Sequence, residues 1–166
     1  MRIVVTAALA LGASTVVAQD LVYSDAATES CVYAQETLAG QRTCIGRSAN
    51  ACMAANDLGS TTVGMGGCLS FELDYWDERL NASYKILLRK AKAVDAEMAE
   101  LGSSAESLAE SLLAAQRAWI PWRDSTCDFE RAQWGGGTGG GPATYACLMR
   151  LTGEQALYLE SVQLGE

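Results

Sequence analysis

Apolar side chains recur at steps of three or four residues along most of the chain, which is the period of an amphipathic α-helix. The clearest run comprises Leu69, Leu73, Trp76, Leu80, Tyr84, Leu87, Ala91, Val94 and Met98. This run predicts one long helix whose other faces carry the charged residues. Asp95, Glu97 and Glu100 place acidic side chains where the dipole of a helix favours basic ones, so we expect a bend or break near Ala93.

A second long helix is predicted after Leu101-Gly102, because Ser103-Ser104-Ala105-Glu106 has the form of a capping box. Its apolar stripe consists of Leu108, Leu112, Ala115 and Trp119, and the helix should end near Ala132. Pro121 removes one backbone donor inside this pattern, so we expect a kink near Arg117. The very short connection predicts that the two long helices pack antiparallel.

The remaining segments predict shorter elements. Residues 28–57 predict two short helices, residues 59–67 a loop, and residues 135–141 a glycine-rich loop. Pro142 suits a first helical position, and a short helix should carry Cys147. Thr152-Gly153-Glu154-Gln155 forms another capping box, for a C-terminal helical turn. The expected fold is all-α, a small antiparallel bundle of about five helices.

The N-terminus has the design of a secretory signal peptide. Arg2 precedes an apolar run that ends in the small-residue pattern Val16-Val17-Ala18. The run is shorter than the ~20 residues that a membrane-spanning helix needs, so a retained anchor is the less favoured alternative. We therefore expect residues 1–18 to be cleaved, leaving residues 19–166 as one domain in the bacterial periplasm or outside the cell, with no membrane span.

Six cysteines follow the predicted cleavage site: Cys31, Cys44, Cys52, Cys68, Cys127 and Cys147. An even number in an exported chain predicts three disulfides. A metal site is disfavoured because the chain has no histidine and no Cys-x-x-Cys pair. Cys127 and Cys147 bracket the glycine-rich loop and form the favoured pair. For the other four, pairing 31 with 44 and 52 with 68 is the nearest-neighbour choice, and the sequence leaves the alternatives open.

The chain is acidic, with 20 Asp and Glu residues against 12 Lys and Arg residues and a net charge of −8. Loss of Arg2 with the signal peptide makes the mature charge −9. Such a protein repels nucleic acid and anionic membranes and attracts a basic partner. Solubility alone explains the same charge, so the charge does not identify a partner.

Few residues are candidates for a catalytic role, and we expect neither an enzyme nor a cofactor. General acid–base catalysis near neutral pH most often uses histidine, which the chain lacks. Asp74, Asp77 and Glu78 lie close together on one predicted helix, where a solvated acidic face is the ordinary explanation. The glycine-rich loop lacks the pattern of a phosphate-binding loop. It is either a spacer between helices or a loop that inserts into a partner.

The segment around Trp119 concentrates aromatic and charged residues. Tryptophan and arginine are common anchors of protein interfaces, which makes a recognition surface one interpretation. The favoured interpretation is structural: Trp119 continues the buried stripe, and Arg123 or Asp124 pairs with a helix terminus or a loop carbonyl.

Several motifs in the second half occur in a specific order. They are Trp76-Asp77-Glu78-Arg79-Leu80-Asn81-Ala82-Ser83-Tyr84, Ala115-Gln116-Arg117-Ala118-Trp119-Ile120, Arg123-Asp124-x-x-Cys127, and Cys147-Leu148-x-x-Leu151-Thr152. In this order, from about residue 68 to residue 159, the chain resembles the LprI-like lysozyme-inhibitor family. Residues 31–67 are an extension beyond the commonest family pattern.

The resemblance implies a helical protein of the bacterial envelope that binds and blocks lysozyme. A basic lysozyme is the implied protein partner, and an inhibitor needs a rigid surface rather than catalytic groups. Two sets of residues are candidates for the contact. One is the acidic helix face with Glu72, Asp74 and Asp77, and the other is the glycine-rich loop with Gly136, Thr138 and Gly140. The alternative function is an envelope adaptor that binds another protein or a wall component.

Overall fold

The computed structural model describes residues 21–164, which form six α-helices and no strand. The helices are α1 (Ala26–Tyr33), α2 (Leu38–Arg42), α3 (Arg47–Ala55), α4 (Thr62–Glu100), α5 (Leu108–Ala132) and α6 (Gly140–Ser161). The expected all-α fold is therefore confirmed. The predicted signal peptide lies outside the described residues.

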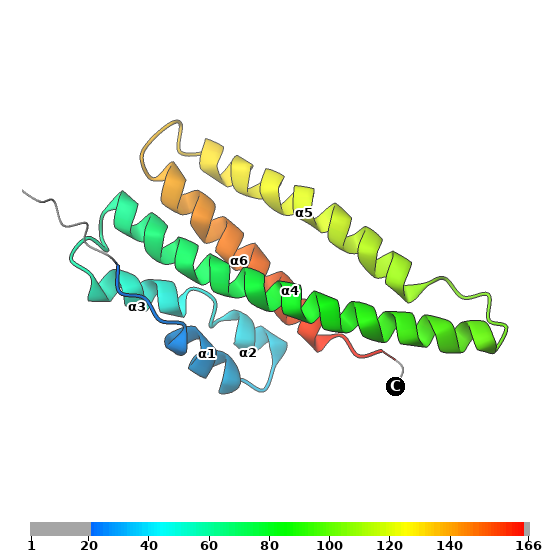
Figure 1. Cartoon of the computed structure of the whole chain (residues 1–166). Helices are drawn as coiled ribbons and strands as arrows, with labels where there is room; N and C mark the ends of the chain where they lie inside the picture. The colour runs from blue at the N-terminus through cyan, green and yellow to red at the C-terminus, as the bar shows by residue number, and fades with distance from the viewer. Residues whose placement is uncertain (1–20, 165–166) are drawn as a thin grey trace, which may run out of the picture.

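The long helices α4, α5 and α6 make up most of the molecule (Figure 1). α4 and α6 form the principal helix pair, and α5 packs on both of them. α5 runs antiparallel to α4, as the short connection between them predicts. α1, α2 and α3 lie on the side of α4 away from α5, and the end of the α4–α5 pair projects beyond α6 (Figure 1). The bundle is therefore thick at the end where α1–α3 pack and slender at the other.

The core lies between α4 and α6. Its largest fully buried side chain is Trp76, with Leu80, Leu87, Leu157 and other apolar residues around it. The predicted stripe of α4 faces this core as far as Ala91, whereas Met98 at its end is 42% exposed. The periodicity therefore identifies the buried face of α4 correctly, except where the helix extends beyond the partner that would cover it.

Three disulfides join neighbouring elements. Cys31 pairs with Cys44, Cys52 with Cys68, and Cys127 with Cys147. The first two tie α1 and α3 to the elements that follow them, and the third joins α5 to α6 across the glycine-rich loop. The arrangement is the nearest-neighbour pairing. It leaves no cysteine free among the described residues.

The segment before α4 contains three helices rather than the expected two. The additional helix is α2, which has only five residues. The side chain of Thr37 caps it by accepting a hydrogen bond from the N–H of Gly40. A single helical turn has too few residues to show a hydrophobic period, which is why the pattern misses it.

Two expectations about α4 are wrong. The segment predicted as a loop over residues 59–67 is helical from Thr62 onward, because Thr61 caps the helix and the glycines serve close packing. A Cβ on Gly64 would lie 1.9 Å from the carbonyl oxygen of Leu58. A bend or break was expected near Ala93, and the break is absent, since α4 is continuous to Glu100.

The acidic residue that suggested a break has another role. The carboxylate of Asp95 accepts hydrogen bonds from the Ser107 hydroxyl at 2.6 Å and from the N–H groups of Leu108 and Ala109. These N–H groups have no partner within α5, so Asp95 satisfies the exposed start of the next helix. The first of these bonds is also the main reason why the pKa of Asp95 is lowered.

α5 begins later than predicted. Its N-cap is Ser107, whose hydroxyl accepts from the N–H of Glu110, rather than Ser103. Ser107 and Glu110 repeat the capping-box spacing four residues downstream, and only the second site is reached by Asp95. The helix continues through Pro121 to Ala132, the predicted end.

The C-terminal segment is one helix, not a short helix followed by a capped turn. Pro142 is its third residue rather than its first, a position where a missing donor still costs nothing. Thr152 and Gly153, the expected cap, are both buried. A Cβ on Gly153 would lie 3.1 Å from Trp76 Cδ2, so this glycine lets α6 approach α4 closely.

None of the helices in the described part of the chain combines the length and apolar character that crossing a membrane requires.

Candidate protein-binding surfaces

Glu72 is not a surface residue, so its prediction as a partner contact is wrong. Its side chain is fully buried. One carboxylate oxygen accepts from the Thr28 hydroxyl at 2.8 Å, the Gly46 N–H at 2.7 Å and the Trp76 indole at 3.1 Å. The other accepts from the Ala49 N–H at 2.7 Å. Glu72 therefore holds α1 and α3 against α4, which is a structural task.

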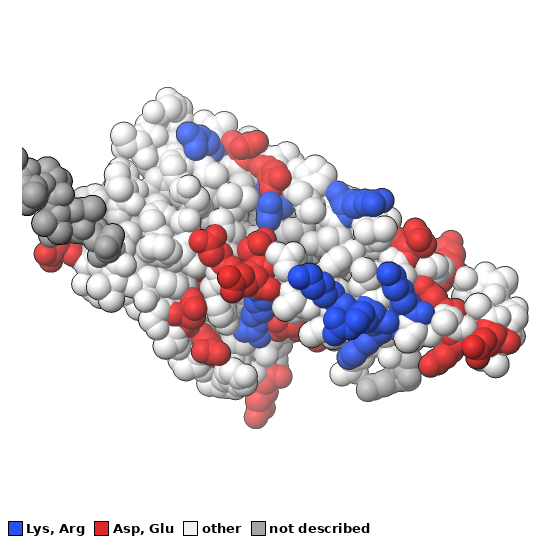
Figure 2. Space-filling view, viewed as in Figure 1, with Lys and Arg blue, Asp and Glu red and all other residues white. Residues whose placement is uncertain are grey.

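Asp74 and Asp77, in contrast, are exposed, and so is Glu78 beside them. None of the four ion pairs found among the described residues involves any of these three carboxylates. We call these three residues the central acidic face. Figure 2 shows acidic side chains gathered over the middle of α4, followed by basic ones along its next turns. The central acidic face is therefore available to a cationic partner.

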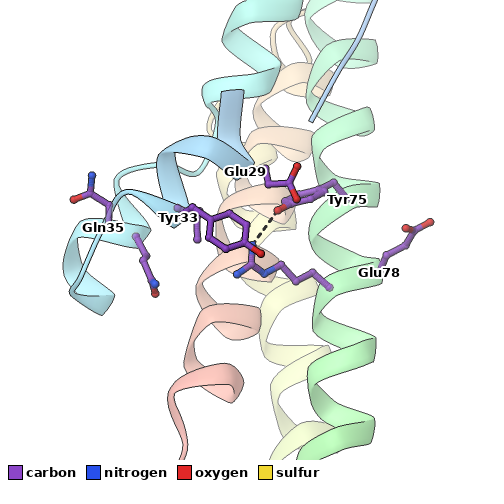
Figure 3. Close-up of a pocket in the computed structure, with 8 residues that line it drawn as sticks. Glu29, Tyr33, Gln35, Tyr75 and Glu78 are labelled. Atoms are coloured by element: carbon purple, nitrogen blue, oxygen red, sulfur yellow. Dashed lines mark hydrogen bonds between the residues drawn. The ribbon is translucent and has the colours of Figure 1, made fainter. Parts of the chain in front are cut away.

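A cleft of ≈ 570 Å³ borders the central acidic face, between α4 and the pair α1 and α2. Its lining is mostly polar and comprises Glu29, Val32, Tyr33, Gln35, Gln41, Tyr75, Glu78 and Arg79. Figure 3 shows the Tyr33 side chain reaching from α1 toward Tyr75 on α4, with Glu29 close to Tyr75 and the Glu78 side chain pointing away from them. Glu78 is thus shared between the cleft and the central acidic face.

Arg79 lines this cleft and is held by contacts within the protein. Its Nε and one terminal nitrogen each donate to Glu160 on α6 at 2.7 Å. The other terminal nitrogen donates to the Tyr75 hydroxyl at 2.9 Å, and the guanidinium carbon lies 5.3 Å from the centroid of the Trp76 ring. The hydrogen bond to Glu160 is the main reason why the pKa of Arg79 is raised. Arg79 therefore remains a cation whose charge is neutralised within the protein.

The pKa of Tyr75 is changed by burial and by the charges around the cleft. Burial is the largest cause that raises the pKa of its hydroxyl, Arg79 opposes the change, and the charge of Glu29 raises it further. Tyr75 therefore stays neutral near pH 7 and serves as an apolar ring with a polar edge.

The glycine-rich loop is exposed where it was expected to be, with one exception. Gly136 and Thr138 are exposed, whereas Gly140 is buried as the first residue of α6, so its prediction as a contact is wrong. Gly135 and Gly136 adopt positive φ angles of 54° and 84°, which other residues rarely adopt. The Trp134 side chain, 54% exposed, lies against Gly139, where a Cβ would be 2.2 Å from its ring. The loop is thus a shaped turn rather than an open spacer.

The motif around Trp119 is structural, although its contacts differ from those expected. Trp119 is partly buried against the core, and Arg123 stacks 5.1 Å from its ring centroid. Arg123 pairs with the neighbouring Asp124 at 2.8 Å and donates to the Thr152 hydroxyl at 3.3 Å. Neither Arg123 nor Asp124 binds a helix terminus or a loop carbonyl in this arrangement. The motif instead fixes α5 to α6.

The projecting end of the α4–α5 pair is a second acidic surface, which the sequence alone did not single out. Residues 93–116 contain no Lys or Arg, and their acidic members are Asp95, Glu97, Glu100, Glu106 and Glu110. Leu101 is 79% exposed there, and Figure 2 shows acidic side chains at this end. We call residues 97–106 the α4–α5 tip. Sequence reasoning missed it because periodicity does not reveal that α6 stops short of it.

Residues 21–164 contain no cluster of side chains suited to holding a metal ion. No group of three or more His, Cys, Asp and Glu side chains there is placed to hold a metal ion. All six cysteines form disulfides, and the chain has no histidine.

Comparison with known families decides the relationship of the chain. The family described as "Lysozyme inhibitor LprI" matches residues 52–159. The chain belongs to the LprI family. The match begins at Cys52 rather than near residue 68, so the part of the chain outside the family pattern is shorter than expected. The matched residues include the α3–α4 disulfide, the central acidic face and the Cys127–Cys147 disulfide.

Two relatives carry names that assign no function. One is an uncharacterized 17.7 kDa protein from the puhA 5' region of Rhodobacter capsulatus, 27% identical over 140 residues, which are 84% of this chain and 86% of the relative. The other, an uncharacterized protein of Rhizobium meliloti, is 29% identical over 86 residues, 52% of this chain and 62% of the relative. The first alignment is longer than the segment from residue 52 to the C-terminus. The similarity therefore extends into the segment before Cys52, which contains Cys31 and Cys44. No solved structure matches the chain.

Proposed function

We propose that this LprI-family protein is exported to the periplasm or secreted, and that it binds a lysozyme-type cell-wall hydrolase and blocks it. The observation that carries the proposal is the family match over residues 52–159. Three disulfides are compatible with a location outside the cytoplasm, where thiols are oxidised. In this proposal residues 1–18 are a cleaved signal peptide and residues 19–166 are the mature domain.

Charge supports the choice of partner. The chain has a net charge of −8, and lysozymes are generally basic, so long-range attraction would steer the two proteins together. The central acidic face is our proposed contact because its carboxylates are exposed and have no cation of their own within the described residues. Asp74, Asp77 and Glu78 can each form an ion pair with a partner without breaking an ion pair within the described residues.

Rigidity supports the inhibitor role. Binding costs less free energy when the contact surface does not have to be ordered on association. The central acidic face lies on a continuous helix whose first half is fixed by the Cys52–Cys68 disulfide and by the buried Glu72. An inhibitor of this kind needs no catalytic group, and we propose that the protein is not an enzyme.

A second candidate function is an envelope adaptor that binds another protein or a wall component. Exposed aromatic side chains at the glycine-loop end favour it: Phe129 is 68% exposed and Trp134 is 54% exposed. Aromatic residues of this kind are common anchors of protein interfaces. They lie on α5 and the following turn, apart from the central acidic face on α4.

Binding to a basic lysozyme, read together with inhibition of cell-wall lysis, tests the proposal. Neutralising the central acidic face should weaken both, and added salt should do the same. Tight binding that is insensitive to salt and to these substitutions, but lost on replacing Phe129 and Trp134, would favour the adaptor surface instead.

A further inference from the structure

The cleft beside the central acidic face has the features of a binding site for a single side chain. It is hollow, with ≈ 570 Å³ of space, and elements distant in sequence build it: Glu29 and Tyr33 come from α1, and Tyr75 and Glu78 come from α4. Small-molecule and side-chain pockets are typically concave, with aromatic walls and a few polar groups that select the ligand.

The charge of the cleft selects a cation. Arg79 donates three hydrogen bonds, two to Glu160 and one to Tyr75, and its charge is balanced by Glu160. It is therefore not offered to an anionic ligand. Glu29 and Glu78 line the same cleft, are exposed, and take part in no ion pair of the described residues. The net charge presented to a ligand is negative.

The aromatic rings select a flat or weakly hydrated cation. Tyr33 is 86% exposed, an unusual degree for an aromatic side chain, and Figure 3 shows its ring directed from α1 toward Tyr75. Tyr75 lines the same cleft from α4. Guanidinium and ammonium groups are attracted to the faces of aromatic rings and bind carboxylates with charge-assisted hydrogen bonds. The protein already holds one guanidinium by such contacts, because Arg79 stacks near Trp76 and pairs with Glu160.

We propose that this cleft binds an arginine side chain of the protein partner, between the ring of Tyr33 and the carboxylate of Glu29. The proposal rests on the proposed function for the identity of that partner, but the chemistry of the cleft does not depend on it. A buried arginine at the centre of an interface commonly contributes a large share of the binding free energy. The cleft would thus be the anchor, and the central acidic face the surrounding charged rim.

The experiment titrates the oxidised, exported form of the protein with Nα-acetyl-arginine amide and follows its amide NMR spectrum. Nα-acetyl-citrulline amide, which has the same shape without the charge, is the matched ligand control. We expect shifts at residues 29–33 and 75–79 with a Kd on the order of 1 mM, as for a ligand of this size, and no saturable shifts with citrulline. Equal responses to the two ligands, or arginine shifts located elsewhere, would overturn the proposal.

Two variants of α1 locate the site without touching the central acidic face. Tyr33→Ala and Glu29→Gln should each weaken arginine-amide binding at least about fivefold, because each removes one of the two contacts that select a cation. Glu36→Gln removes one charge from an exposed residue outside the cleft lining and should leave the Kd unchanged. Unchanged binding in both α1 variants would rule out the cleft.

The same variants separate this inference from the proposed function. If arginine amide binds in the cleft and no lysozyme binds, the cleft site stands and the inhibitor role fails. If lysozyme binds equally well to the unmodified protein, Tyr33→Ala and Glu29→Gln, the inhibitor role stands and the cleft is not its anchor.

Discussion

Glu72 on α4 accepts a hydrogen bond of 2.7 Å from the backbone N–H of Ala49 on α3. The same carboxylate accepts from Thr28 and Gly46, so one buried side chain satisfies donors from three segments. Gly46 reaches it with a φ of 93°, which favours glycine at that position. The N-terminal helices are therefore attached to the bundle by a polar contact as well as by disulfides.

Replacing Glu72 should destabilise the protein strongly. Glu72→Gln places an amide donor opposite either the Ala49 N–H or the other three donors, and Glu72→Ala leaves all four unsatisfied. We expect losses in the free energy of unfolding of about 2 kcal/mol for Gln and about 3 kcal/mol or more for Ala. Urea denaturation measures both, with exposed Glu78→Gln on the same helix as the control. A loss below about 0.5 kcal/mol for Glu72→Ala would contradict the buried network.

The close packing of α6 on α4 predicts opposite effects at two glycines of α6. A Cβ on Gly153 would lie 2.9 Å from Ile45 Cδ1 and 3.1 Å from Trp76 Cδ2, whereas a Cβ on Gly141 would meet nothing within 4 Å. Gly153→Ala should lower the free energy of unfolding by about 1–3 kcal/mol, since overpacking outweighs the better helix propensity of alanine. Gly141→Ala should raise it slightly or leave it unchanged. Equal effects in thermal denaturation would be inconsistent with the packing described.

The cap formed by Asp95 predicts a dependence of stability on pH. The hydrogen bond from Ser107 is the first cause of the lowered pKa of Asp95, so folding favours its ionised form. Its stabilisation is present above the unfolded pKa and is lost as the pH falls through the lower, folded value. Asp95→Asn should therefore lower Tm at pH 7, and the difference from the unmodified protein should shrink below pH ~4. A Tm difference that stays constant from pH 7 to pH 2 would show that the charge is not involved.

The disulfide between Cys127 and Cys147 encloses the glycine-rich loop and joins α5 to α6, with a sequence separation of 20. Replacing both cysteines by alanine should lower the free energy of unfolding by about 3 kcal/mol, chiefly by releasing the unfolded chain. Denaturation of the oxidised double variant measures this effect. If Tm instead stayed the same, the loop would already be constrained by Trp134 and by the contacts of Arg123.

Sequence periodicity was sufficient for the helical fold and the buried face of α4, whereas the order of the cysteines favoured the observed disulfides but left alternatives open for four of them. Periodicity was insufficient where one residue type serves two purposes. Asp95 indicated a break in α4 because the C-terminal end of a helix disfavours acidic side chains, yet it caps the following helix. Thr152 and Gly153 have the spacing of a helix start, yet they provide a buried hydroxyl and a close approach. Local patterns do not distinguish these uses, because the partner in each case is distant in the sequence.

The binding surfaces were predictable only in part for the same reason. Asp74 and Asp77 are exposed as expected, whereas Glu72, on the same stretch of helix, is buried once α1 and α3 pack over it. The cleft exists only because α1 lies beside α4. Arg79, which lines it, is held by Glu160, 81 residues later in the chain. Neither relationship leaves a signal in the spacing of the residues.

The most direct test of the account is lysozyme binding by two matched triple variants of the oxidised protein. Asp74→Asn/Asp77→Asn/Glu78→Gln neutralises the central acidic face, and Glu97→Gln/Glu100→Gln/Glu106→Gln removes the same charge from the α4–α5 tip. At low salt the account predicts that the first variant binds about tenfold or more weakly and loses inhibition of wall lysis, while the second stays within about twofold of the unmodified protein. Loss of binding only in the tip variant, or no binding by the folded, unmodified protein, would contradict it.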